Sequence, residues 1–230
     1  MVYYICVVDY EATCWPRSDN KNNKRHEIIE FPSVLLKWND DEKTPQLCEI
    51  SRFQRFVKPL KYPKVSKYCY DLTGITQEQV NNGVDLLTAM NDHLKWLYNI
   101  VQGKKVTIVT CGHWDLRDMF PMDFKNLKAT LDEDLQSKFK PHSVYTKYVN
   151  IKDLFEIMTE TTKAPGMPGM LSYYELPLEG RHHSGIDDCH NIGRIFVALV
   201  VRDGLDKKIF MENIHDLKKT VWKYSQGSSK

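Results

Sequence analysis

Hydrophobic residues near the start of the chain form an almost unbroken run from Tyr3 to Val8, and two acidic residues follow it. Such a run is typical of a strand that is buried on both faces of a sheet. Asp9 and Glu11 stand two residues apart, and side chains alternate along a strand, so both carboxylates point to the same side. The pattern therefore predicts a buried first strand that brings two carboxylates together at its end.

Two neighbouring carboxylates at the end of a buried strand repel each other and resist removal from water. A bound divalent cation removes both problems, and carboxylate oxygens suit Mg²⁺ or Mn²⁺. The alternative is a strand end that enters solvent, where both acids are hydrated. The spacing alone is common, since Asp40 and Glu42 repeat it in a polar segment. Asp9 and Glu11 are therefore candidate metal ligands that need further partners.

The next segments predict a hairpin beside the first strand. Residues 27–38 and 47–57 have the character of strands, and the polar residues 39–45 between them predict a turn. Pro32 inside the first of these strands predicts a bulge or an edge position, because proline cannot donate a hydrogen bond to the ladder. Residues 58–67 carry four lysines and two prolines, which indicates either a solvated loop or one that faces phosphates.

Beyond the hairpin, helices alternate with short buried strands. A helix is predicted over 85–102, where apolar residues recur every three or four positions and Gly103 follows. Strands are predicted at 106–111 and 149–151. Further helical segments are predicted at 116–119 (closed by Pro121), within 124–145, from 151 to 158, at 170–175 and at 187–202. This order predicts an α/β fold in which a mixed central sheet is flanked by helices.

Length and composition limit the classes of protein. The 230 residues are 42% hydrophobic, enough for one sizeable core, and the net charge of +2 permits a nucleic-acid partner without indicating one. The six cysteines form no Cys-x-x-Cys pair, which favours a reducing intracellular compartment, the cytoplasm or the nucleus. No signal peptide or membrane-spanning run is expected. We expect a catalytic domain over 1–205, a helical extension over 206–224 and a disordered tail over 225–230.

A third carboxylate, Asp115, follows the strand predicted at 106–111. It reaches the same edge of the sheet as the first pair, or it caps a helix. A histidine-rich loop before the last helix then offers two overlapping His-x₄-Asp registers, His182 with Asp187 and His183 with Asp188. The choice between these two registers depends on which aspartate faces the sheet.

Helical periodicity separates the two aspartates. Asp188 shares its helix face with Ile192, Ile195 and Leu199, so it points toward the core. Asp187 shares its face with Asn191, Arg194 and Ala198, so it is expected to point toward water, where the helix dipole favours an acid in the first turn. A carboxylate on the apolar side of a helix is costly unless it meets a cation or hydrogen-bond donors. The register of His183 with Asp188 is therefore preferred.

Four core-side carboxylates with a histidine have a clear chemical use. Two divalent ions can clamp a phosphodiester, one at the attacking water and one at the leaving oxygen. The imidazole of His183 can accept the proton of that water, because histidine titrates near neutral pH.

These residues, in this order, resemble the DEDDh 3′–5′ exonucleases of the DnaQ-like, ribonuclease-H-related fold. The closer resemblance is to the Eri-type group, which includes histone-mRNA 3′ exonuclease and Snipper-like enzymes. It spans about residues 3–203. It rests on Asp9-Tyr10-Glu11-Ala12-Thr13-Cys14, His26-Glu27-Ile28-Ile29-Glu30-Phe31-Pro32, Leu72-Thr73-Gly74-Ile75-Thr76, Thr110-Cys111-Gly112-His113-Trp114-Asp115 and His183-Ser184-Gly185-Ile186-Asp187-Asp188.

The resemblance implies a role for each part of the site. Asp9, Glu11, Asp115 and Asp188 would bind two divalent ions, Mg²⁺ or Mn²⁺, and His183 would be the general base. The residues implied in substrate binding would contact the terminal nucleotide (Ala12, Thr13), wedge against the last bases (Leu72, Thr73, Gly74, Ile75) and line the nucleotide pocket (Trp114).

The expected function is a metal-dependent 3′–5′ exoribonuclease that releases nucleoside 5′-monophosphates. Its expected partner is RNA with a single-stranded or short overhanging 3′ end, and we expect a monomer without a membrane partner. Two alternatives stay open. One is a deoxyribonuclease with the same chemistry, because Tyr173-Tyr174-Glu175 resembles a nematode apoptotic nuclease of this group. The other is a non-catalytic nucleic-acid-binding protein on a nuclease fold.

Overall fold

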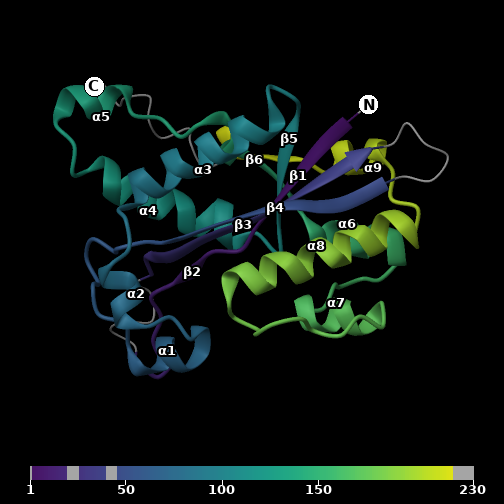
Figure 1. Cartoon of the computed structure of the whole chain (residues 1–230), viewed down its shortest axis with the longest axis horizontal. Helices are drawn as coiled ribbons and strands as arrows, with labels where there is room; N and C mark the ends of the chain where they lie inside the picture. Colours follow the sequence, from purple (N-terminus) through teal and green to yellow (C-terminus); the bar gives the residue numbers. More distant parts are fainter. Residues whose placement is uncertain (1, 20–25, 40–45, 220–230) are drawn as a thin grey trace.

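Seven strands form one mixed sheet in this computed structural model, which describes residues 2–19, 26–39 and 46–219 (Figure 1). The strands are β1 (Val2–Val8), β2 (Glu11–Ala12), β3 (Ile28–Asn39), β4 (Gln46–Phe56), β5 (Val106–Thr110), β6 (Lys147–Asn150) and β7 (His215–Asp216). The expected turn at 39–45, apart from its first residue, and the expected tail at 225–230 lie outside the described residues.

The helices follow the predicted order. They are α1 (Lys67–Thr73), α2 (Gln77–Asn81), α3 (Leu86–Val101), α4 (Phe120–Lys128), α5 (Glu133–Lys138), α6 (Ile151–Thr159), α7 (Met167–Tyr173), α8 (Gly185–Val201) and α9 (Lys207–Glu212). A π-helix, η1 (Trp114–Met119), leads into α4, and two short 3₁₀ turns lie at η2 (Ser143–Thr146) and η3 (Leu217–Lys219). Each described helix is too short or too polar to span a bilayer.

The pairing of β1 sets the topology of the sheet. It lies between β3, which is antiparallel to it, and β5, which is parallel. Residues 33–39 of β3 pair with both β1 and β4, so β4 lies on the opposite edge of β3. On the other side the sheet continues through β6, parallel to β5, and ends at antiparallel β7. The mixed sheet and the antiparallel hairpin that the sequence predicts are confirmed.

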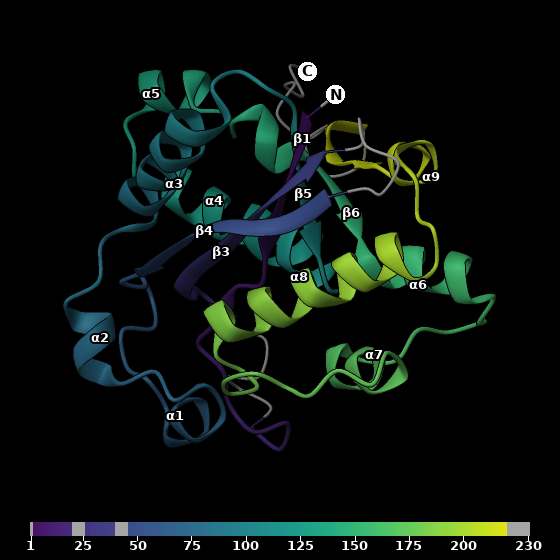
Figure 2. The same cartoon turned by 45° about the vertical axis from the view of Figure 1, so that its right-hand side comes forward.

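Alternation along β1 divides the interior into two cores. Tyr3, Ile5 and Val7 pack with α6, α7 and α8, whereas the even-numbered residues from Tyr4 to Val8 pack with α3 and α4. Figures 1 and 2 show these two groups of helices on opposite faces of the sheet. The run of buried residues in β1 thus reflects a strand covered on both faces, as expected.

Two prolines occupy positions that the sequence did not predict. Pro32 lies in an interior strand, and the register shift between β3 and β4 falls at Leu35 and Leu36. Pro32 is tolerated because β1 pairs from Ser33 onward and β2 only up to Glu30, so no ladder partner lies opposite it on that side. Pro121 does not close a helix. It lies in the first turn of α4, where the missing backbone N–H of proline is tolerated.

Residues after 205 add to the sheet as well as to the helices. The expected helical extension contains α9, but β7 then pairs with β6. Phe210 of α9 is buried in one core and Leu217 in the other. The segment after residue 205 therefore packs into the same two hydrophobic cores as the residues before it.

Candidate active site

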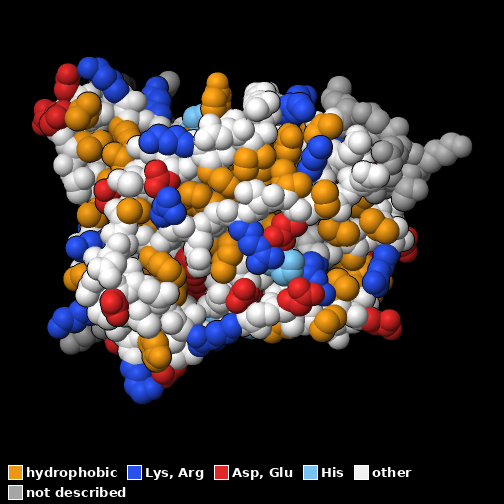
Figure 3. All heavy atoms as spheres, in the orientation of Figure 1, with side chains coloured by type: hydrophobic (Ala, Val, Ile, Leu, Met, Phe, Trp, Pro, Cys, Tyr) orange, Lys and Arg blue, Asp and Glu red, His pale blue; other side chains and the backbone are white. Residues whose placement is uncertain are grey.

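Three of the predicted carboxylates converge at the end of β1. Asp9 lies between β1 and β2, Glu11 lies in β2, and Asp188 lies in the first turn of α8. One oxygen of each carboxylate lies within 4.8 Å of the others. Figure 3 shows the surface hollowed between the α1–α2 segment and α8, with acidic side chains at the bottom of the hollow. The strand breaks after Val8, yet the two-residue spacing still brings Asp9 and Glu11 together.

Asp115 reaches this group from the other side of β1. It is buried in the first turn of η1, and its Oδ1 accepts a hydrogen bond of 2.9 Å from the backbone N–H of Tyr10. The N-cap position of η1 belongs to His113, so the helix-cap alternative for Asp115 is wrong. Its charge is the largest neighbouring contribution to the raised pKa of Asp9.

Burial raises the pKa of each of these three carboxyl groups, and repulsion between neighbouring charges raises those of Asp9 and Glu11 further. Burial raises the pKa of Asp9 well above its usual range, and the charges of Asp115, Glu11 and Asp188 raise it further. Burial, with the charges of Glu30 and Asp188, raises the pKa of Glu11 to about 9. Burial raises the pKa of Asp115 to about 7, even though the Tyr10 N–H opposes the shift. These groups cannot all be charged without added positive charge, and their all-oxygen donor set fits a hard divalent cation.

The histidine loop meets Asp188 through both of its histidines. The backbone N–H of His183 donates to Asp188 Oδ2 at 2.8 Å, while His182 Nδ1 lies 3.2 Å from Asp188 Oδ1. The two imidazoles stack with centroids 3.9 Å apart, and His183 has a φ of 66°, in the left-handed region. The ring that contacts the carboxylate here is therefore that of His182. The role of His183 as general base stays a prediction.

The preference for Asp188 over Asp187 agrees with the structure. Asp188 is buried, whereas Asp187 is half-buried and accepts a hydrogen bond from the backbone N–H of Arg181. The expectation that the Asp187 face meets water is wrong for Asn191 and Ala198, which are both buried. The Asn191 amide bonds to both backbone groups of Glu179, in the segment that leads from α7 to α8.

Glu30 is a buried acid beside the site that sequence reasoning did not select. Its Oε2 accepts the backbone N–H of Gly185 at 3.2 Å, and its Oε1 accepts the Gln54 amide at 2.7 Å. A Cβ on Gly185 would lie 2.7 Å from Pro32 Cγ and 2.8 Å from the Asp9 carbonyl oxygen, so only glycine lets α8 approach this closely. The signal was present, because an acid inside an apolar strand needs a partner.

Two residues expected at the terminal nucleotide are buried around β2. Ala12 is buried, and the Thr13 hydroxyl accepts the backbone N–H of Glu27 at 3.0 Å. By contrast, Trp114 is 42% exposed, and its ring meets His26 edge to face at 5.9 Å between centroids. The indole next to Asp115 in the chain is thus exposed, and its role in a nucleotide pocket stays a prediction.

The segment expected to wedge against bases lies at the end of α1. Thr73 and Ile75 are buried, and Gly74 caps the helix with a φ of 76°. The guanidinium of Arg181 fills the space beside Gly74 and donates to the carbonyl oxygen of Asp71 at 2.8 Å. Arg181, another residue that the sequence did not single out, thus connects the histidine loop to α1 across the hollow.

A model of the RNase_T family, described as exonuclease, matches residues 6–196. The chain belongs to the RNase_T exonuclease family. The match begins in β1 and ends within α8, so it includes all four carboxylates and the histidine loop.

Two relatives and one solved structure support this assignment. The chain is 34% identical over 218 residues to rat 3′-5′ exoribonuclease 1, and the aligned region covers 92% of this chain and 56% of the rat protein. It is 30% identical over 223 residues to human ERI1 exoribonuclease 2, covering 90% of this chain and 29% of the human protein. The nuclease domain of 3′hExo, a DEDDh family member bound to rAMP, has a TM-score of 0.70 and 30% identity, covering 87% of this chain and 92% of that domain.

The comparisons confirm the resemblance that the motifs indicated. The family, the Eri-type relatives and the ribonuclease-H-like exonuclease fold are those expected from the sequence. The chain spans about half, or less, of the length of these two curated relatives.

Proposed function

We propose that this chain is a 3′–5′ exoribonuclease that hydrolyses phosphodiesters from the 3′ end of RNA and releases nucleoside 5′-monophosphates. The observation that carries the proposal is the convergence of the Asp9, Glu11 and Asp188 carboxylates within 4.8 Å of one another, with Asp115 beside them. The names of the relatives add the substrate class, since both are exoribonucleases. The proposed substrate end is single-stranded or a short 3′ overhang.

The four carboxylates would hold two divalent ions, Mg²⁺ or Mn²⁺. When bound, such ions stabilise charge on the phosphoryl group in the transition state and lower the pKa of the attacking water. His183 accepts the proton of that water. Its pKa is lowered, first by burial and then by the charge of His182, so a neutral imidazole is available at neutral pH. Glu30 and Gly185 hold the N-terminus of α8 against β3 and so position Asp188.

The remaining residues of the hollow would bind the substrate. Trp114 stacks on a terminal base through its exposed ring. Ala12 and Thr13 shape the floor beneath the terminal nucleotide, and residues 72–75 lie against the last bases. The exposed lysines of the 58–67 segment would contact upstream phosphates, so binding should weaken as salt rises.

The test is a direct assay on the full chain. One sequence, labelled at every phosphate, is supplied as single-stranded RNA, as DNA, as RNA with one 3′-terminal deoxynucleotide and as blunt duplex, each with Mg²⁺ or EDTA. We expect stepwise shortening of the RNA with Mg²⁺ only, mononucleotide products, and slow loss of the duplex. Faster loss of DNA would replace this proposal with a deoxyribonuclease. Binding of RNA without release of mononucleotides would replace it with a non-catalytic binding protein.

A further inference from the structure

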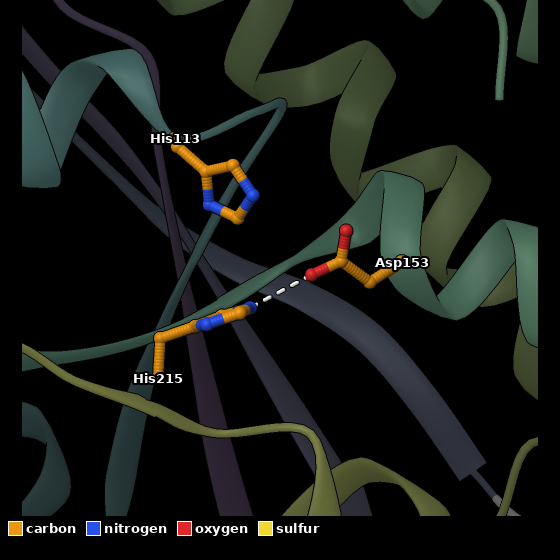
Figure 4. Close-up of side chains that lie close together, drawn as sticks. All are labelled: His113, Asp153 and His215. Carbon is orange, nitrogen blue, oxygen red and sulfur yellow. Dashed lines mark hydrogen bonds and ion pairs between the residues drawn. The ribbon is translucent and has the colours of Figure 1, made fainter. Parts of the chain in front are cut away.

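A second cluster of metal-ligating side chains lies away from the carboxylate centre, in residues that the proposed reaction does not use. It contains His113 from the loop after β5, Asp153 from the first turn of α6, and His215 from β7. Figure 4 shows the three side chains pointing toward one another from three separate elements. Of the three such clusters among the described residues, the other two share Asp188.

The atoms of the cluster are close enough to take up one ion. A ligating atom from each of the three residues lies within 4.8 Å of the others, and His215 Nε2 lies 2.7 Å from Asp153 Oδ2. The two imidazoles stand nearly perpendicular, at 84°, with centroids 5.0 Å apart. Ligand atoms of a tetrahedral ion are separated by roughly 3.3 Å, as zinc–ligand distances of about 2.0–2.1 Å require. Since no pair of ligating atoms lies more than 4.8 Å apart, closing the cluster onto an ion shortens each separation by at most about 1.5 Å.

Neighbouring polar groups hold these side chains in ligating orientations. The Tyr148 hydroxyl lies 2.7 Å from His113 Nδ1, and Nε2 is turned toward Asp153. His113 Nε2 also lies 3.5 Å from the Asn150 amide nitrogen, a long contact that an ion would replace. The Asn150 amide donates to Asp153 Oδ1 at 2.6 Å and leaves Oδ2 to face His215. Metal-ligating histidines and carboxylates are oriented by hydrogen bonds of this kind.

The chemistry of the ligand set distinguishes this cluster from the carboxylate centre. Two imidazole nitrogens with one carboxylate suit Zn²⁺, whereas an all-carboxylate set suits Mg²⁺ or Mn²⁺. All three residues are partly exposed, so an ion can enter and a water can complete a tetrahedron. An ion here would join β7 to α6 and to the loop that continues into Trp114 and Asp115.

We propose that His113, Asp153 and His215 form a structural Zn²⁺ site that fastens the segment after α9, and the loop before η1, to the end of the sheet. The site is separate from the proposed catalytic metals and does not depend on the proposed reaction. Its effect is to hold residues beyond 205 in the fold.

The test is Zn²⁺ binding to the metal-free full chain carrying Asp188→Asn, because this change weakens both other clusters at once. Isothermal titration with Zn²⁺, in excess Mg²⁺, measures stoichiometry and affinity. Co²⁺ absorption reports a tetrahedral site with nitrogen ligands. We expect one Zn²⁺ per chain, and an affinity that falls roughly 100-fold or more when His215→Ala or Asp153→Asn is added, since even outer-shell changes cost about 10–100-fold.

His190→Ala is the matched control, because His190 also contacts carboxylates, those of Glu49 and Glu179, but no second histidine. It should leave Zn²⁺ binding unchanged. His215→Cys should restore binding and add a thiolate-to-Co²⁺ charge-transfer band, which a purely hydrogen-bonding role would not produce. Equal Zn²⁺ affinity with and without His215→Ala, or no Zn²⁺ bound in the Asp188→Asn background, would overturn the proposal.

Discussion

Buried acids just before β3 and just after β1, two strands that pair with each other, are stabilised in opposite ways. The carboxylate of Glu27, 3% exposed, accepts hydrogen bonds of 2.7–3.1 Å from the backbone N–H groups of Leu60, Lys61 and Tyr62. The pKa values of Asp9 and Glu11 are instead raised, first by burial and then by the charges of each other or of further acids around them. The Glu27 carboxylate is thus stabilised by backbone donors, whereas Asp9 and Glu11 stay close together in spite of their mutual repulsion.

The difference separates a structural acid from a functional one. The donors around Glu27 fix the start of the lysine-bearing segment and leave that carboxylate no further need of a partner. The Asp9 group keeps an electrostatic cost, when its members are charged, that an added cation removes. Several acids gathered together are therefore evidence for a metal site, whereas a single acid whose two oxygens are both occupied by backbone donors is evidence for a role in folding.

The largest expected effect is that of Asp9→Asn. Loss of one ligand should reduce exonuclease turnover roughly 10⁴-fold, because bound metal supplies several kcal/mol of transition-state stabilisation. In EDTA the melting temperature should stay the same or rise, because one of the repelling charges is gone. Turnover above a few per cent of the unmodified protein would contradict the assignment of Asp9 as a metal ligand.

His183→Ala should lower kcat on the order of 10²–10⁴-fold, the usual contribution of a general base, while divalent-metal binding persists. His182→Ala is the matched variant, since its ring stacks on that of His183 and contacts Asp188. It should do far less to kcat. A larger loss with His182→Ala would assign the base to the ring that contacts Asp188 in the structure.

Glu27→Gln should act in the opposite direction to Asp9→Asn on stability. The amide group would turn two N–H donors toward backbone donors, so the free energy of unfolding should fall by about 2–3 kcal/mol. Urea denaturation measures this change, and Glu133→Gln, at an exposed position of α5, is the control. An unchanged free energy of unfolding would show that Glu27 is not a structural acid, and would contradict its contrast with the Asp9 group.

Trp114→Ala should raise KM for RNA about tenfold with an unchanged melting temperature, because base stacking contributes about 1–3 kcal/mol. Steady-state kinetics and thermal melting separate the two roles. Tyr98→Ala, at an exposed position of α3, should change neither quantity. A collapse in stability would show that Trp114 serves the core instead.

The smallest expected effect is on pH-dependent stability without metal. Glu11 and Asp115 have folded-state pKa values of about 9 and about 7, above those of unfolded carboxyl groups. At pH values between the unfolded and folded pKa values of these groups, the folded state therefore binds more protons than the unfolded state. The free energy of unfolding falls as the pH rises through this range. In EDTA the melting temperature should drop by a few degrees between about pH 5 and about pH 8. Mg²⁺ should reduce the drop, and an equal drop with Mg²⁺ would argue against metal at these acids.

The sequence by itself determined which face each acid occupies. The two-residue spacing brought Asp9 and Glu11 together even though β1 ends at Val8, and helical periodicity turned Asp188 toward the sheet. Both patterns are local, because they follow from backbone geometry within a short stretch of the chain. The order of the elements and the motifs on them were then enough to indicate the family and its fold.

Only the tertiary structure decided which residues contact each face of a helix or strand. Periodicity predicted that Asn191 points toward water, but it is buried and bonded to the backbone of Glu179. Pro121 was expected to close a helix, but it lies in the first turn of α4, which follows η1 directly. His215 and Asp153 meet across 62 residues, and Glu30 meets the N-terminus of α8 across 155. Such contacts depend on the packing of whole elements against one another, whereas the pattern along one element records only the direction in which a side chain leaves it.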